Sequence, residues 1–166
     1  MQKYSQVSPA ITLFNVDQMQ GHEFEYFVAQ LLRKQGFRSV KVTSGSSDFG
    51  VDILATKYFT KWAIQCKRYT SNLSRTAISD AVAGKAHYGC AKAMVVTNSY
   101  FSKQALVFSK TTNCTLIDRD ALDIWMGGSL PIKSSFVFRK IFFLILFITS
   151  CACLFYGFLL WLSFYQ

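Results

Sequence analysis

Short apolar runs alternate with longer mixed segments along most of the chain, which predicts strands and helices in turn. Val51–Ala55 and Trp62–Cys66 are short and apolar, and the polar-aromatic stretch between them reads as a turn, so they predict a β-hairpin. Further strands are expected at about 39–43, 92–97 and 115–117. Apolar residues at helical spacing predict helices at about 18–35, 73–88, 103–111 and 118–126.

The start of the chain is less regular. Ile11, Leu13 and Val16 fit either a strand or a packing arm, so residues 1–16 are assigned as an N-terminal arm without a function. Asp17 followed by Gln20 resembles a capping box, which favours a single first helix from about residue 18. Residues 17–126 are expected to form one α/β domain, in which a mixed sheet is flanked by helices.

The hairpin brings candidate chemistry together. Side chains alternate along a strand, so Gln65 and Lys67 point to the same face, opposite to Cys66. A half-buried lysine and glutamine need partners, and Asp52 at the head of the neighbouring strand can supply one. A carboxylate, an amide oxygen and an ammonium group are therefore expected to converge.

Such a group of oxygens suits Mg²⁺, which binds hard oxygen ligands, usually with one or two carboxylates. Asp52, the Gln65 amide oxygen and the backbone carbonyl of Cys66 are the expected metal ligands, and Mn²⁺ is a possible substitute. Lys67 would stand where its charge acts on a phosphate or on the attacking group. The alternative is an ion pair on a solvated strand.

Several further motifs accompany this pair, in order and spacing: Gly21-His22-Glu23-Phe24-Glu25, Asp48-Phe49-Gly50-Val51-Asp52, Gln65-Cys66-Lys67-Arg68-Tyr69, Val95-Val96-Thr97, Phe101-Ser102 and Leu116-Ile117-Asp118. With them the chain resembles the Mrr-type restriction endonuclease family, a branch of the PD-(D/E)xK nuclease superfamily. The resemblance implies a restriction-endonuclease-like αβββαβ core. It also implies an active site of Asp52, Gln65 and Lys67, with a glutamate of the first helix assisting, and glutamine before the lysine is usual in this branch.

The first helix contains two glutamates. Glu25 shares an apolar stripe with Val28 and Leu32, whereas Glu23 falls on the side of polar residues. Glu25 is therefore the expected assisting residue, bound to the metal directly or to a second ion through water. The alternative is a glutamate that reaches solvent at the domain edge.

The chain is basic, with 18 Lys and Arg against 9 Asp and Glu and a net charge of +9. This balance suits nucleic acid or an anionic membrane surface, and basicity alone does not choose between them. Arg68, Arg75 and Lys85 follow the proposed site in sequence and are candidate phosphate contacts on DNA. Ordinary solvated side chains are the alternative for each.

Residues 141–165 are almost continuously apolar and aromatic and carry no charge. At about 1.5 Å per residue this run can cross a hydrocarbon core of about 30 Å, so it predicts one transmembrane helix after a linker at 127–140. A buried core helix is the alternative. Lys133, Arg139 and Lys140 precede the run, so the nuclease domain is expected on the cytoplasmic side of a bacterial-type inner membrane.

Together these features predict a membrane-anchored, magnesium-dependent endonuclease that hydrolyses DNA phosphodiester bonds. The sequence leaves open a non-catalytic tether that uses the nuclease fold to hold DNA or a partner at the bilayer. It also leaves open an RNA or branched substrate, and a homodimer, which double-strand cuts would require. A separate DNA-reading domain, usual in Mrr-type enzymes, is not expected within these 166 residues.

Overall fold

The computed structural model describes residues 11–43 and 49–127. Within these ranges no helix is long and apolar enough to cross a bilayer. The turn expected at 45–48, nearly all of the predicted linker and the predicted membrane segment lie outside the described residues. Residues 1–129 form one compact unit and residues 130–166 a second. All of the described residues belong to the first unit.

Five strands form one mixed sheet in the order β1-β2-β3-β4-β5. The first three are antiparallel neighbours, and β3, β4 and β5 are parallel to one another. Their bounds are β1 (Arg38–Val42), β2 (Ile53–Lys57), β3 (Thr60–Lys67), β4 (Lys92–Thr97) and β5 (Cys114–Ile117). The predicted hairpin, mixed sheet and parallel crossovers are thus confirmed.

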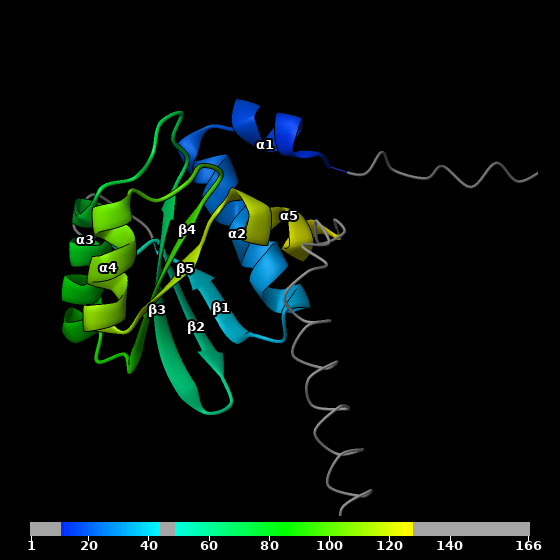
Figure 1. The fold of residues 1–166 in the computed structure, drawn as a ribbon. Helices are drawn as coiled ribbons and strands as arrows, with labels where there is room; N and C mark the ends of the chain where they lie inside the picture. The colour runs from blue at the N-terminus through cyan, green and yellow to red at the C-terminus, as the bar shows by residue number, and fades with distance from the viewer. Residues whose placement is uncertain (1–10, 44–48, 128–166) are drawn as a thin grey trace, which may run out of the picture. The chain divides into compact units, whose positions relative to one another are not determined.

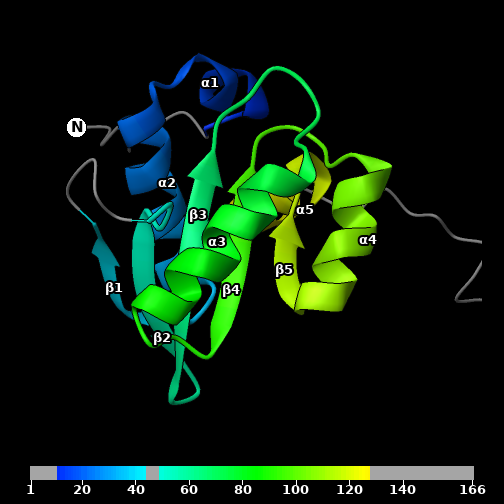
Figure 2. The ribbon, with the colours of Figure 1, turned by 90° about the vertical axis from the view of Figure 1, so that its left-hand side faces the viewer.

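Helices cover both faces of the sheet (Figures 1 and 2). One face packs against α2 and α5, and the other packs against α3 and α4. The helices are α1 (Leu13–Gln18), α2 (Gly21–Lys34), α3 (Arg75–His87), α4 (Lys103–Thr112) and α5 (Arg119–Met126). The order α2-β1-β2-β3-α3-β4 is the expected αβββαβ core.

The N-terminal region differs from the prediction, because two helices replace the strand or arm and the single helix from residue 18. Thr12 caps α1 through a reciprocal pair of hydrogen bonds with Asn15. The chain is extended at Met19, and α2 then begins with the Gln20 backbone N–H donating to Glu23 Oε2 at 2.6 Å. The capping box is therefore Gln20 and Glu23, and Glu23 is exposed as expected.

Two apolar clusters fill the space between the sheet and the helices. The first lies under α1, α2 and α5, and its largest fully buried side chains are Phe24, Leu32, Ile53, Ile64 and Leu122. The second lies under α3 and α4 and includes Leu73, Ile78, Ala81, Val95 and Phe101. All members of both clusters that the structure describes lie in the first unit.

The turn of the β2–β3 hairpin contains only Tyr58 and Phe59, because Lys57 pairs with Thr60. Both turn residues have positive φ, 48° and 62°. This is the conformation of a type I′ turn, whose twist matches that of the flanking strands. It costs about 1–2 kcal/mol for a side chain with a Cβ, so the turn is strained at both positions.

Gly84 lets α3 approach the segment that leads into β2. A Cβ at this position would overlap Val51 Cγ2 and lie 2.7 Å from the Phe49 carbonyl oxygen. Gly84→Ala is therefore expected to lower the free energy of unfolding by about 2 kcal/mol, measured by urea denaturation. Gly21→Ala is the control, since a Cβ at Gly21 meets no atom within 4 Å. Equal stability of the two variants would contradict the close packing.

Candidate active site

Asp52 is fixed at the head of β2 by its backbone and its carboxylate. Its N–H donates to the Ile64 carbonyl at 2.9 Å, and its carbonyl accepts from the Thr43 N–H at 2.9 Å. Its Oδ2 accepts from the backbone N–H of Cys66 at 2.6 Å. The Cys66 N–H thus donates to a side chain where a backbone carbonyl would accept in a regular ladder. This hydrogen bond holds the Asp52 carboxylate beside β3.

Gln65 lies beside Asp52. The paired register of β2 and β3 ends at Ile53 and Ile64. Asp52, just before β2, donates to the Ile64 carbonyl and accepts from the Cys66 N–H, so it contacts both chain neighbours of Gln65. Gln65 is 2% exposed, and its Oε1 is buried without a hydrogen-bond partner among the described residues. Lys67 is two positions further along the same strand and on the same face. The structure thus places Gln65 and Lys67 on one face of β3 with Asp52 beside that strand, and the convergence of the three groups on one metal ion stays a prediction.

The charges around Cys66 agree with this convergence. Burial raises the pKa of the Cys66 thiol well above its usual value, the carboxylates of Asp52 and Glu25 raise it further, and the Lys67 ammonium lowers it. Three charged groups therefore surround a neutral thiol, which is not available as a thiolate ligand.

Glu25 is half-buried on α2, the helix that covers the Cys66 face of the sheet. Gln65 and Lys67 emerge on the other face, toward α3. Glu25 therefore approaches the site from the side of the thiol, and its contact with a metal stays a prediction. The described residues contain no cluster of three or more His, Cys, Asp or Glu side chains suited to a metal. A cation here would need the Gln65 amide oxygen or a backbone oxygen.

Asp80 of α3 is a candidate site residue that the sequence did not indicate. A Cβ built on Gly50 would lie 2.9 Å from Asp80 Cβ and 3.1 Å from Gln65 Nε2, so the two side chains meet at this glycine. Gly50 has φ +72°, a conformation that favours glycine. Asp80 and Lys67 also line one cleft of about 390 Å³. A second carboxylate thus lines the same cleft as the lysine.

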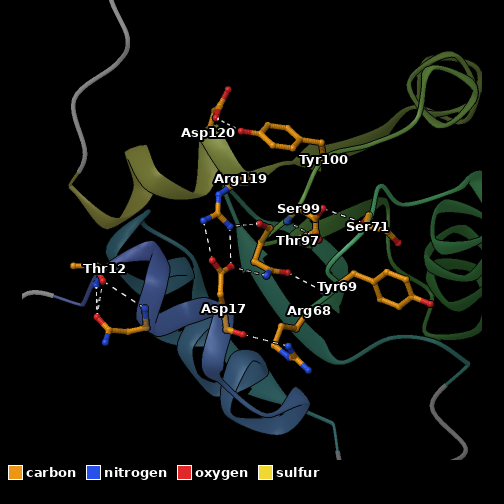
Figure 3. Close-up of polar contacts among 12 residues, drawn as sticks. Thr12, Asp17, Arg68, Tyr69, Ser71, Thr97, Ser99, Tyr100, Arg119 and Asp120 are labelled. Carbon is orange, nitrogen blue, oxygen red and sulfur yellow. Dashed lines mark hydrogen bonds and ion pairs between the residues drawn. The ribbon is translucent and has the colours of Figure 1, made fainter.

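The segment that follows Lys67 is held by a polar network (Figure 3). The Tyr69 N–H donates to Asn98 Oδ1 at 2.8 Å, and Asn98 Nδ2 donates to Asp17 Oδ1 at 2.8 Å. Arg119 binds both oxygens of Asp17, at 2.8 Å each, and also donates to the Asn98 carbonyl. Hydrogen bonding from Arg119 lowers the pKa of Asp17. Asp17, predicted as a cap, instead links α1 to Asn98, which follows β4, and to Arg119 at the start of α5.

Two of the three predicted phosphate contacts lie at the Lys67 end of the sheet. Arg68 donates to the Asp17 carbonyl at 3.3 Å, and its Nε is buried without a partner among the described residues, so this side chain is partly committed to the domain. Arg75 begins α3 and shares an open cleft of about 620 Å³ with Lys103 at the start of α4. Lys103 was not singled out from the sequence.

Lys85 lies elsewhere. It is in the last turn of α3, and its carbonyl accepts from the Cys90 N–H at 2.9 Å, just before β4 begins. Its ammonium also lowers the pKa of Cys114, which burial raises to about 11 overall. Because β4 and β5 begin at the end of the sheet opposite to Lys67, the structure separates Lys85 from the candidate site.

The model of the Mrr catalytic domain, described as restriction endonuclease, matches residues 16–126, more than half of the chain. The chain belongs to the Mrr family of restriction endonucleases. The match places the restriction endonuclease domain of this Mrr-type chain in the part that contains all five strands. No protein with a curated description matches the chain in sequence.

Two solved structures resemble this Mrr-type chain. The DNA modification-dependent restriction endonuclease AspBHI has a TM-score of 0.51 at 20% identity, and the match covers 69% of this chain and 33% of AspBHI. A protein of unknown function, AF1548, has a TM-score of 0.49 at 21% identity, covering 64% of this chain and 58% of the other. The match with AspBHI shows the restriction-endonuclease-like fold. This Mrr-type chain therefore spans less than two thirds of either protein's length.

Proposed function

We propose that this Mrr-type protein is a membrane-anchored endonuclease that hydrolyses DNA phosphodiester bonds with a divalent metal ion, Mg²⁺ or its substitute Mn²⁺. The observation that carries the proposal is the Gln65 amide oxygen, which is buried without a partner among the described residues. Asp52 lies beside it, bonded to both chain neighbours of Gln65. A buried acceptor without a donor is costly, and a bound cation would remove that cost.

The donor set fits such an ion. Asp52 offers one carboxylate, Gln65 offers an amide oxygen, and the Cys66 carbonyl is the third predicted ligand. Hard oxygen donors with few carboxylates are typical of Mg²⁺ sites, which retain several waters. A divalent ion held here would supply Lewis-acid stabilisation of charge on the scissile phosphate.

The remaining side chains have roles that follow from their charge and position. The Lys67 ammonium would bind a phosphate oxygen and stabilise the negative charge that grows in the transition state. Asp80, which lines the same cleft of about 390 Å³ as Lys67, would orient that ammonium or accept a proton from the attacking group. Glu25 would act from the thiol side, on the same ion or through water.

The DNA backbone would reach the site from the end of the sheet where α3 and α4 begin. Arg75 and Lys103 line an open cleft there, and positive charge at such a cleft attracts phosphates. The net charge of +9 supports the same partner. The charge-free run 141–165 is the basis for the proposed membrane anchor.

The full-length protein in nanodiscs should convert supercoiled plasmid to nicked or linear DNA in Mg²⁺ or Mn²⁺ and lose this activity in EDTA. Calorimetry should show binding of Mn²⁺ to the protein alone. Duplex, single-stranded, branched and RNA substrates, tested side by side, would identify the substrate class. Binding of DNA without cleavage of any substrate, and without metal binding, would favour the non-catalytic tether and contradict the proposal.

A further inference from the structure

The turn of the β2–β3 hairpin carries the two most exposed aromatic side chains in the described part of the chain. Tyr58 is 87% exposed and Phe59 is 103% exposed, compared with 71% for Phe14. A type I′ turn favours Asn followed by Gly, so the aromatic pair does not suit its own backbone. Lys57 Nζ lies 5.7 Å from the centroid of the Tyr58 ring, and most of the surface of both rings stays exposed. Both rings are available to a partner outside the domain.

The end of the sheet that carries this turn is basic. Here β1, β4 and β5 begin, and α2, α3 and α4 have their last turns. We call it the basic end, and it consists of residues 33–38, 57–61, 85–92 and 110–114. The charged residues in these segments are Arg33, Lys34, Arg38, Lys57, Lys61, Lys85, Lys92 and Lys110.

Helix dipoles explain only part of this charge. Lysine and arginine in the last turn of a helix complement its negative end, which accounts for the basic residues of α2, α3 and α4. Helix dipoles do not explain the charges of Arg38, Lys61 and Lys92, because these residues lie on strands. The carboxylates that the structure describes all lie in other segments, at Asp17, Glu23, Glu25, Asp52, Asp80, Asp118, Asp120 and Asp123.

We propose that the basic end, with Tyr58 and Phe59 at its tip, docks on the surface of an anionic phospholipid bilayer. Aromatic rings settle at the level of the headgroups, and clustered lysines and arginines attract anionic lipids. A cleft of about 400 Å³ beside the turn, lined by Arg38 and Lys57 among others, has room for a headgroup. The inference rests on the proposed anchoring, since the apolar run 141–165 would hold the domain at such a surface.

The position of the candidate active site favours a bilayer over DNA as the partner of this end. Strand β3 runs from Thr60 beside the turn to Lys67 in the site, and its eight residues, with a rise of about 3.3 Å from one to the next, place the two ends about 23 Å apart. Figures 1 and 2 both show the hairpin turn and α1 at opposite ends of the domain. Docking through the turn would leave Lys67 facing away from the lipid, where DNA can enter.

The full-length protein in nanodiscs tests this inference through hydrogen–deuterium exchange of residues 57–61. Exchange is expected to be several-fold slower in phosphatidylglycerol nanodiscs than in phosphatidylcholine nanodiscs. The double variant Tyr58→Asn/Phe59→Gly should lose this difference between lipids. It should also unfold at a Tm about 5 °C higher, because it has the residues that the turn prefers, so lost docking cannot be ascribed to misfolding.

Residues 1–129, which form one compact unit with two buried apolar clusters, give a second measurement without the apolar run. This fragment should co-sediment with phosphatidylglycerol vesicles, and the double variant should partition about tenfold more weakly because two aromatic rings are lost. Phe14→Asn is the matched control, since it removes an exposed aromatic at the other end of the domain. It should partition like the wild type.

Equal exchange in both lipids, with equal partition of the wild type and the double variant, would overturn the inference. Weaker binding of duplex DNA by the double variant, with unchanged vesicle partition, would also overturn it and make the basic end a nucleic-acid contact. Plasmid nicking and resistance to alkaline extraction report on the proposed nuclease and anchor separately. If the protein does not nick plasmid, or is released by alkaline extraction, the vesicle measurement on residues 1–129 still tests the docking inference.

Discussion

Asp52→Asn should reduce plasmid cleavage by at least about 1,000-fold while leaving the domain folded. The reason is that Asp52 has two separable roles. Its Oδ2 accepts from the Cys66 N–H at 2.6 Å, and the amide oxygen of asparagine can accept the same hydrogen bond. Its negative charge would bind the cation, and asparagine cannot supply that charge. The substitution therefore keeps the strand pairing and removes the proposed metal ligand.

Two measurements on this variant separate those roles. Calorimetry should show that Mn²⁺ binding is lost, and thermal unfolding should show a Tm close to that of the wild type. Asp123→Asn, which makes the same change of charge on α5, should cleave and bind metal normally. Full cleavage by Asp52→Asn would exclude this carboxylate as the metal ligand, and a large fall in Tm would show that it is mainly structural.

Much of the fold could be predicted from the sequence because the apolar positions have regular periods. The strands that flank Tyr58 and Phe59 were visible as short apolar runs, and the helices appeared at a spacing of three and four residues. The close approach marked by Gly84 was also visible, since a glycine within a helical pattern suggests a packing contact. The alternation of one strand and its pairing with the next predicted Asp52 beside Gln65, and in the structure Asp52 bonds to both chain neighbours of that glutamine.

Other features depended on contacts that a local pattern does not contain. The break between α1 and α2 arises from capping at Thr12 and Gln20, whereas the sequence pattern favoured a cap at Asp17. Asp80 lies in a helix of mixed composition, and only the packing of α3 against Gly50 places it beside Gln65. Its role in the site has no signal in the sequence alone.

The separation of Lys85 from the site has a simple geometric cause. A helix rises about 1.5 Å per residue, so the ten positions between Arg75 and Lys85 span about 15 Å along α3. Arg75 at the first position of α3 stays near the Lys67 end, and Lys85 in the last turn reaches the basic end. Closeness to Lys67 in sequence therefore corresponds to closeness in space for Arg75 but not for Lys85.

Lys67→Met should lower the rate of cleavage by about 100- to 1,000-fold and leave DNA affinity nearly unchanged. Methionine keeps much of the length and apolar volume of the lysine stem, so the cleft of about 390 Å³ that Lys67 shares with Asp80 should keep its shape. The ammonium is one cation among many on a protein of net charge +9, so its loss changes overall attraction for DNA little. Its effect should be concentrated in the transition state, where charge grows on the phosphate.

Single-turnover cleavage rates and fluorescence anisotropy with a labelled duplex separate chemistry from binding in this variant. Lys67→Arg should recover part of the rate, because it restores the charge with a different geometry. Lys41→Met, on the exposed side of β1, should match the wild type in both measurements. A loss of affinity equal to the loss of rate would make Lys67 a DNA-binding residue, and an unchanged rate would remove it from the active site.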